Sequence, residues 1–218
     1  MLIVGTSLNK KLHQQVVKNV TDCDVTYAKA YTVDKDEDAL HPDINFLRIV
    51  PEELHKQNYS VLVLSCGPNE ISNLNTDLDY EENINEWRER VSKSSEKMHY
   101  LAEWCLDAYP NLSKVIIVKR PPRYDNNVKA HLSEYANNIL DDIWMIRGAP
   151  HRIVISRQEL ECDGDLRVQR YGDQSYNNYD GIHLRGKFAV QQSGRRRNCG
   201  ADRTVQHMTR TFINMIIN

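Results

Sequence analysis

An aspartate and a histidine late in the chain, Asp180 and His183, have the side chains that general base catalysis requires. With two residues between them, one turn of chain can place the carboxylate behind one nitrogen of the imidazole. The other nitrogen is then free to accept a proton. The pair therefore predicts a base and the group that orients it, and the chemistry still needs a nucleophile.

A serine that could serve as this nucleophile follows the first apolar run of the chain. Ser7 lies in Gly5-Thr6-Ser7-Leu8, at an expected strand-to-helix turn where its hydroxyl can project beyond the end of a sheet. A serine hydroxyl is a weak nucleophile until an adjacent base removes its proton. Taken alone, Ser7 is also the expected N-cap of the following helix.

An amide that could stabilise negative charge follows the third apolar run. In Gly67-Pro68-Asn69-Glu70, the side chain of Asn69 is a suitable donor to an oxyanion, and Gly67 gives the loop freedom to present it. The alternative is a plain turn, because Gly, Pro and Asn are common turn residues.

Short apolar runs alternate with longer amphipathic segments, a pattern typical of parallel strands joined by helices. The expected strands are 2–4, 25–30, 61–64, 115–118 and 153–155. The first clear helix is expected at 81–108, with an apolar stripe of Ile84, Trp87, Val91, Met98, Leu101, Cys105 and Leu106. A second is expected at 128–144, with a stripe of Leu132, Tyr135, Ile139 and Ile143. We interpret both stripes as core packing.

The three motifs occur in a fixed order at the ends of the alternating pattern, and together they resemble the SGNH (GDSL-type) hydrolases. The matching blocks are Gly5-Thr6-Ser7-Leu8 with G-D-S-L, Gly67-Pro68-Asn69-Glu70 with G-x-N-D, and Asp180-Gly181-Ile182-His183 with D-x-x-H. The resemblance covers about residues 1–186. It implies an α/β fold, a flavodoxin-like three-layer α/β/α sandwich around a five-stranded parallel sheet. It also implies hydrolysis of carboxylic esters, including lipid, acyl and acetyl esters.

The resemblance also implies a role for each matching residue. Ser7 would be the nucleophile, His183 the general base and then acid, and Asp180 the group that orients His183. The Asn69 amide and the backbone N–H of Ser7 would bind the oxyanion of an acyl-enzyme reaction, without a cofactor or a metal. A small-molecule or lipid ester is the expected substrate.

The sequence departs from the family pattern in three places. Thr6 and Glu70 each replace an aspartate, and we expect these changes to adjust the loops. The family also supplies an oxyanion N–H from a glycine after the second strand, but no glycine lies between Gly5 and Gly67. The N–H of Ala30, Tyr31 or Thr32 is expected to take its place. This departure is compatible with weak or very selective activity.

The composition and the net charge limit the classes of protein to which this chain can belong. The 218 residues are 40% hydrophobic and 27% charged, which predicts a soluble globular chain with one favoured domain. The net charge of −2 gives no whole-protein attraction to nucleic acid or membrane. Five cysteines without C-x-x-C spacing argue against a disulfide framework and a zinc site. We expect an intracellular, cytoplasmic protein with no membrane span, and the oligomeric state stays open.

Two groups of arginines are candidate anion sites. Arg120 and Arg123 follow the fourth expected strand and could bind an anionic substrate group, although a surface turn with solvated arginines is favoured. Arg195-Arg196-Arg197 lies in a basic loop, and we interpret it as solvated rather than bound to nucleic acid or acidic lipid. This loop and a last helix near 203–217 form the segment 191–218, expected to pack on the hydrolase-like domain 1–190.

A second function class stays open beside the esterase. The C-terminal domain of the germ-plasm protein Oskar resembles an SGNH hydrolase without its active residues and binds RNA, so a non-catalytic module for RNA or another anionic partner is the alternative. Ser7, Asp180 and His183 favour the enzyme. The segment 180–186 is also similar to SGNH esterase domains of animal mobile elements, which would make this chain one domain of a longer polyprotein.

Overall fold

The fold was determined as a computed structural model. It describes residues 1–6, 10, 13–14, 16–17, 23–35, 41–65, 69–120, 123, 125–147, 153–156, 161–162 and 165–166. Within these residues, no helix combines the length and the apolar character needed to cross a membrane.

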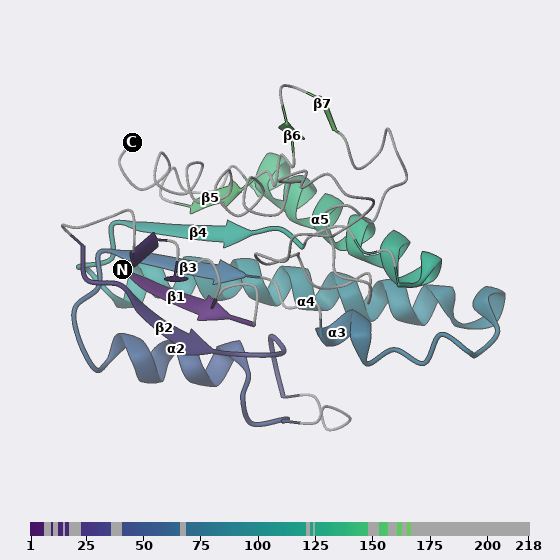
Figure 1. The fold of residues 1–218 in the computed structure, drawn as a ribbon, viewed down its shortest axis with the longest axis horizontal. Coiled ribbons are helices and arrows are strands. Elements are labelled where there is room, and N and C mark those ends of the chain that lie inside the picture. Colours follow the sequence, from purple (N-terminus) through teal and green to yellow (C-terminus); the bar gives the residue numbers. More distant parts are fainter. Residues whose placement is uncertain are drawn as a thin grey trace, which may run out of the picture.

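A five-stranded parallel sheet forms the centre of the molecule (Figure 1). Its strands are β1 (Leu2–Gly5), β2 (Thr26–Lys29), β3 (Val61–Ser65), β4 (Lys114–Val118) and β5 (Ile153–Ser156). The order β2-β1-β3-β4-β5 is that of the flavodoxin-like folds. All five predicted strands are confirmed, and each bound differs by no more than one residue. An additional antiparallel pair, β6 (Glu161–Cys162) and β7 (Asp165–Leu166), was not predicted.

The central strands are buried on both faces, which explains why they read as continuous apolar runs. Successive side chains point to opposite faces. One face carries Leu2, Val4, Leu62, Leu64, Val115 and Ile117, which belong to the largest apolar cluster. The other face carries Ile3, Val61, Val63, Ile116 and Val118, which cluster with Val16. This two-sided burial agrees with the expected α/β/α sandwich.

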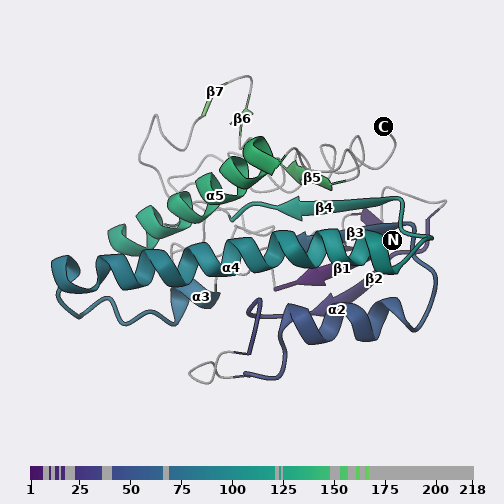
Figure 2. The ribbon, with the colours of Figure 1, turned by 180° about the vertical axis from the view of Figure 1, so that it is seen from behind.

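Helices α2 (Phe46–Leu54) and α4 (Tyr80–Ala108) cover the first face, and Figure 2 shows α4 lying across the sheet. The N-cap of α4 is Asp79, whose carboxylate accepts the N–H groups of Glu81 and Glu82 at 2.9 and 3.2 Å. This N-cap explains the observed start of a helix that was predicted at 81–108. Every residue of its predicted stripe is buried.

Helix α2 was not predicted. It begins at the N-cap Asn45, whose side chain accepts the N–H of Arg48 at 3.0 Å, and it contains Pro51. A proline inside a helix removes one hydrogen bond, and in a sequence it indicates a helix break. In a helix of only nine residues, this signal outweighs the short apolar pattern. Burial of Phe46, Val50 and Leu54 against the sheet stabilises the helix in spite of Pro51.

The second predicted helix is confirmed as α5 (Asn127–Arg147), but its buried stripe differs from the expected one. Leu132 is buried as predicted. Ala136 and Leu140 are the next fully buried apolar residues, whereas Ile139 and Ile143 are only partly buried. The buried residues of α5 are those on the side that packs against its neighbours, chiefly α4, and they are not always the largest apolar residues.

A group of helices extends beyond the carboxyl ends of the strands. It consists of the first half of α4, the start of α5 and the single-turn helix α3 (Asn69–Ser72), and Figure 1 shows all three beyond the arrowheads of β1 and β3. A separate apolar cluster holds the group together, formed by Ile71, Leu74, Ile84, Trp87, Val91, Leu132 and Ala136. We call this group the helical extension.

Candidate active site

The carboxyl ends of two neighbouring strands define the candidate site. In β1 and β3, Val4 lies beside Leu64, so Gly5 and Ser65 leave the sheet at the same edge. The chain continues from β1 to β2 on one side and from β3 to β4 on the other, which makes this edge the point where the strand order reverses. Open parallel sheets bind ligands at such a point. The two predicted motifs that carry Ser7 and Asn69 follow these two strands.

The end of β1 is held by a tyrosine from the neighbouring strand. Tyr27 on β2 donates its hydroxyl to the carbonyl oxygens of Gly5 and Thr6, at 3.0 and 3.1 Å. Burial, together with the charge of Tyr31, raises the pKa of Tyr27 to about 12. Tyr27 therefore stays protonated near neutral pH and fixes the chain just before Ser7. No sequence pattern pointed to this residue.

Asn69 is the first residue of α3, and its neighbours attach this helix to the rest of the protein. Glu70 is buried, and its carboxylate accepts the backbone N–H of Val33 at 2.5 Å. Ile71 is fully buried in the apolar cluster of the helical extension. A glutamate at the position of the aspartate in the G-x-N-D pattern thus has a structural role, because its side chain reaches the segment that follows β2.

The three predicted stand-ins for the missing glycine lie in that segment. The N–H of Ala30 donates to the carbonyl of Gly5 at 3.1 Å, and the N–H of Tyr31 donates to the carbonyl of Ile44 at 2.9 Å. Thr32 pairs with Asn45 in a short parallel bridge. The segment after β2 thus continues the strand-like pairing beyond the end of β2. The N–H groups of Ala30 and Tyr31 are already used within the fold, which argues against both as oxyanion donors in this conformation.

The two arginines after β4 are buried rather than solvated. Arg120 is 2% exposed and Arg123 is 4% exposed, so the favoured interpretation of a solvated surface turn was wrong. The guanidinium of Arg120 donates to the hydroxyls of Ser94 and Ser95, at 3.3 and 3.4 Å. Asn137 also pairs with its backbone N–H and carbonyl. Binding of a substrate anion by these arginines stays a prediction.

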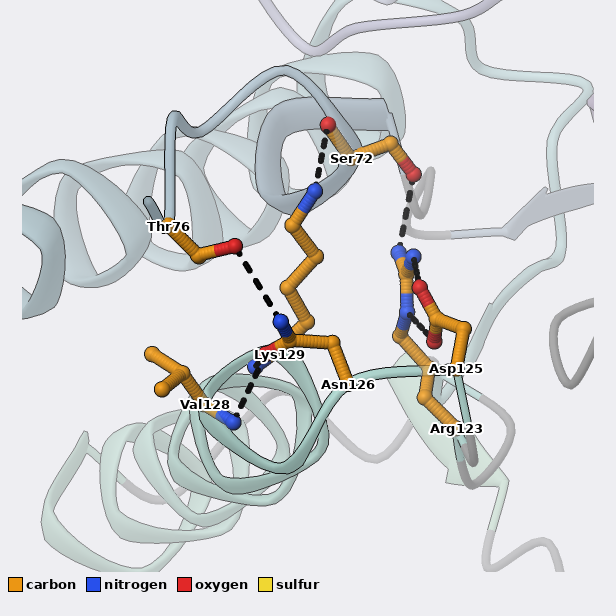
Figure 3. A network of polar contacts seen from close by, with 7 residues as sticks. All are labelled: Ser72, Thr76, Arg123, Asp125, Asn126, Val128 and Lys129. Carbon is orange, nitrogen blue, oxygen red and sulfur yellow. Dashed lines mark hydrogen bonds and ion pairs between the residues drawn. The ribbon is translucent and has the colours of Figure 1, made fainter. Parts of the chain in front are cut away.

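Arg123 belongs to a polar network between α3 and α5 (Figure 3). Its guanidinium pairs with both carboxylate oxygens of Asp125, at 2.9 and 2.6 Å, and donates to the Ser72 hydroxyl at 2.8 Å. Burial alone would raise the pKa of Asp125. The hydrogen bonds and charge of Arg123 outweigh that effect and hold this pKa below its usual 3.8. No sequence pattern indicated Ser72 as a partner of Arg123.

A cavity of about 420 Å³ lies between the segment after β2, α3 and α4. Four acidic and four basic side chains line it, together with Thr32, Val33 and Ser94. The charged residues are Asp34, Lys35, Glu70, Glu86, Glu89, Arg90, Lys93 and Lys97. Lys97 pairs with Asp34, and this hydrogen bond is the main reason that the pKa of Asp34 lies below its usual value. The side chains that line the cavity are therefore mostly charged, and their charges are balanced overall.

Several predicted site residues lie outside the described residues. They are Ser7, Gly67, Asp180 and His183, and the same holds for Arg195-Arg196-Arg197 and the expected helix at 203–217. The roles given to them stay predictions. In the part of the chain that the structure describes, no three histidine, cysteine, aspartate or glutamate side chains form a group that could hold a metal.

Solved structures of other proteins share this fold. Est24, a carbohydrate acetylesterase from Sinorhizobium meliloti, aligns over 99% of this chain and 97% of its own, with a TM-score of 0.63 and 13% identity. A catalytic mutant of Axe2, an acetylxylan esterase from Geobacillus stearothermophilus, aligns over 99% of this chain and 92% of its own, with a TM-score of 0.56 and 9% identity. No family model matches the chain, and no curated protein matches its sequence. The structural likeness confirms the α/β fold that the resemblance to SGNH hydrolases implied.

Proposed function

We propose that this protein is a serine hydrolase of carboxylic esters. The observation that carries the proposal is the pairing of β1 with β3, because these strands end side by side and lead into the segments that hold Ser7 and Asn69. The fold shared with two acetylesterases supports the same reaction class. The residue types agree, because a serine, a histidine and a carboxylate are sufficient for acyl transfer.

In the proposed reaction, His183 removes the proton from the Ser7 hydroxyl, and the serine oxygen attacks the ester carbonyl. Asp180 orients His183 and stabilises its positive charge. The Asn69 amide and the Ser7 N–H stabilise the oxyanion of the tetrahedral intermediate. His183 then gives its proton to the departing alcohol. Water, activated by the same histidine, hydrolyses the acyl-enzyme and releases the acid.

The lining of the cavity supports a proposal about the alcohol of the substrate. Thr32, Val33 and Glu70 line it, and these residues adjoin the segments that follow β2 and β3. Val33 is the one aliphatic side chain among its lining residues. A lipid chain would leave these charged groups without water, which is unfavourable. We therefore propose a short acyl group, such as acetyl, on a polar alcohol rather than a lipid ester.

Mutation of the nucleophile tests the proposal. The unsubstituted protein should hydrolyse p-nitrophenyl acetate and react covalently at Ser7 with a fluorophosphonate probe. Ser7→Ala should lower kcat by at least about 10³-fold and abolish the labelling. Ser92→Ala is the matched control, because the Ser92 hydroxyl donates to the Glu96 carboxylate in an exposed hydrogen bond on α4.

Absence of both turnover and labelling in the unsubstituted protein would refute the esterase. If that protein instead bound single-stranded RNA with an affinity that falls steeply as salt rises, the non-catalytic binding module would be supported.

A further inference from the structure

Helix α3 depends on its surroundings for its position. It has four residues, Asn69–Ser72, and one helical turn is not stable in isolation. The direction of the Asn69 side chain therefore depends on the contacts that hold the other residues of the turn.

Three polar contacts hold α3, one at its start and two at its end. At its start, the buried carboxylate of Glu70 accepts the N–H of Val33 at 2.5 Å, which connects α3 to the segment after β2. At its end, the hydroxyl of Ser72 accepts from Arg123 at 2.8 Å, which connects α3 to the segment before α5. Lys129 on α5 donates to the Ser72 carbonyl at 3.0 Å (Figure 3).

The contact at Ser72 is directional because Arg123 is itself held in place. Both carboxylate oxygens of Asp125 accept from its guanidinium, and such a two-point pair fixes the plane of the group. The side chain of Arg123 is 2% exposed, so water has little access to replace these contacts. One guanidinium nitrogen is thus aimed at a defined position of the Ser72 hydroxyl.

We propose that Arg123 is a positioning residue for ester hydrolysis, which acts through Ser72 and α3 on the oxyanion donor Asn69. This inference rests on the proposed function. In this proposal, Arg123 is buried in order to position α3 and not in order to bind an anionic group of the substrate. Arg123 does not touch the reacting atoms in this mechanism, and its effect reaches them through one helical turn.

Ser72→Ala is the most selective test, because it removes the acceptor and leaves the pair between Arg123 and Asp125 intact. We expect kcat for p-nitrophenyl acetate to fall about tenfold to a hundredfold, since small displacements of a catalytic group have effects of this size. KM should change by no more than about twofold, because the interaction concerns the transition state. Arg123→Lys should also lower kcat, because lysine lacks the two-point geometry.

Thr76→Val is the matched control. The Thr76 hydroxyl accepts from Asn126 at 3.2 Å in the same network, but Thr76 lies after α3. Its kcat should stay within about twofold of that of the unsubstituted protein. If Thr76→Val lowers kcat as much as Ser72→Ala, the network has only a general structural role and the proposal is wrong.

A double-mutant cycle with Asn69→Ala identifies the path of the effect. Asn69→Ala should lower kcat about 10²–10³-fold as the loss of an oxyanion donor. Ser72→Ala should then cause no further loss in the Asn69→Ala background, because the group that it positions is gone. An equal loss in both backgrounds would overturn the proposal.

The outcomes separate this inference from the proposed function. An active protein whose kcat does not respond to Ser72→Ala refutes the positioning role alone. An unsubstituted protein without turnover or labelling of Ser7 refutes the esterase, and the positioning role with it.

Discussion

The two halves of α4 are held in place in different ways. The second half packs on the sheet through Met98, Leu101, Ala102, Cys105 and Leu106, in the largest apolar cluster. The first half lies beyond the sheet and contributes Ile84, Trp87 and Val91 to a smaller cluster with α3 and α5. Two buried serines, Ser94 and Ser95, separate the halves and receive the guanidinium of Arg120.

One helix thus contributes to the packing on the sheet and to the packing beside the candidate site. Burial of apolar surface is non-directional, so it secures the sheet without setting the direction of a polar group. The helical extension combines less apolar packing with directional contacts, such as those of Arg123 with Asp125 and Ser72. A candidate site that requires fixed geometry lies beside the second kind of packing.

The largest expected effect comes from the half of α4 on the sheet. Met98 is fully buried, and Met98→Ala should lower the free energy of unfolding by about 2–5 kcal/mol through lost burial and a residual cavity. Urea denaturation measures this change. The activity per folded molecule should not change, because Met98 packs away from α3. A loss of kcat in fully folded Met98→Ala would contradict the division between the two halves.

A smaller effect on stability is expected in the helical extension, and it depends on pH. Asp125→Asn removes the charge that pairs with Arg123, and should lower the free energy of unfolding by about 1–3 kcal/mol at neutral pH. The pKa of Asp125 in the folded state lies below its usual 3.8. The carboxylate therefore stabilises the fold above its unfolded pKa, and this contribution is lost as pH falls through the lower folded pKa.

Urea denaturation of both proteins from pH 7 to about pH 2.5 tests this sign. The difference between the unsubstituted protein and Asp125→Asn should narrow over the acidic part of this range. A constant difference across the range would show that the charge of Asp125 is not the stabilising feature.

The smallest expected change in stability comes from isoleucine-to-valine substitutions, which allow a direct comparison of the helical extension with the sheet. Ile71 and Ile117 are both fully buried, the first in α3 and the second in β4. Ile71→Val and Ile117→Val should each lower the free energy of unfolding by about 0.5–1.5 kcal/mol. Only Ile71→Val should also lower kcat, because it loosens the turn that carries Asn69. Equal kcat values would mean that packing under α3 does not control the site.

The prediction from sequence succeeded where the signal is local. Buried parallel strands appear as short apolar runs, so all five strands were found within one residue at each end. The long apolar stripe did the same for α4. Helix α2 was missed because Pro51 interrupts a short pattern, and α3 was missed because a single turn has no period to detect. The catalytic roles of Ser7, Asn69, Asp180 and His183 stay predictions.

The sequence by itself determined the strands, the main helices and the order in which the candidate catalytic motifs follow them. These features depend on the alternation and spacing of apolar residues within a short segment, so they can be recognised in the sequence itself. Only the tertiary structure decided that Arg120 and Arg123 are buried, that Tyr27 holds the end of β1, and that Ser72 meets Arg123 across 51 positions of sequence. Such contacts arise from the packing of distant segments, and no local pattern records them.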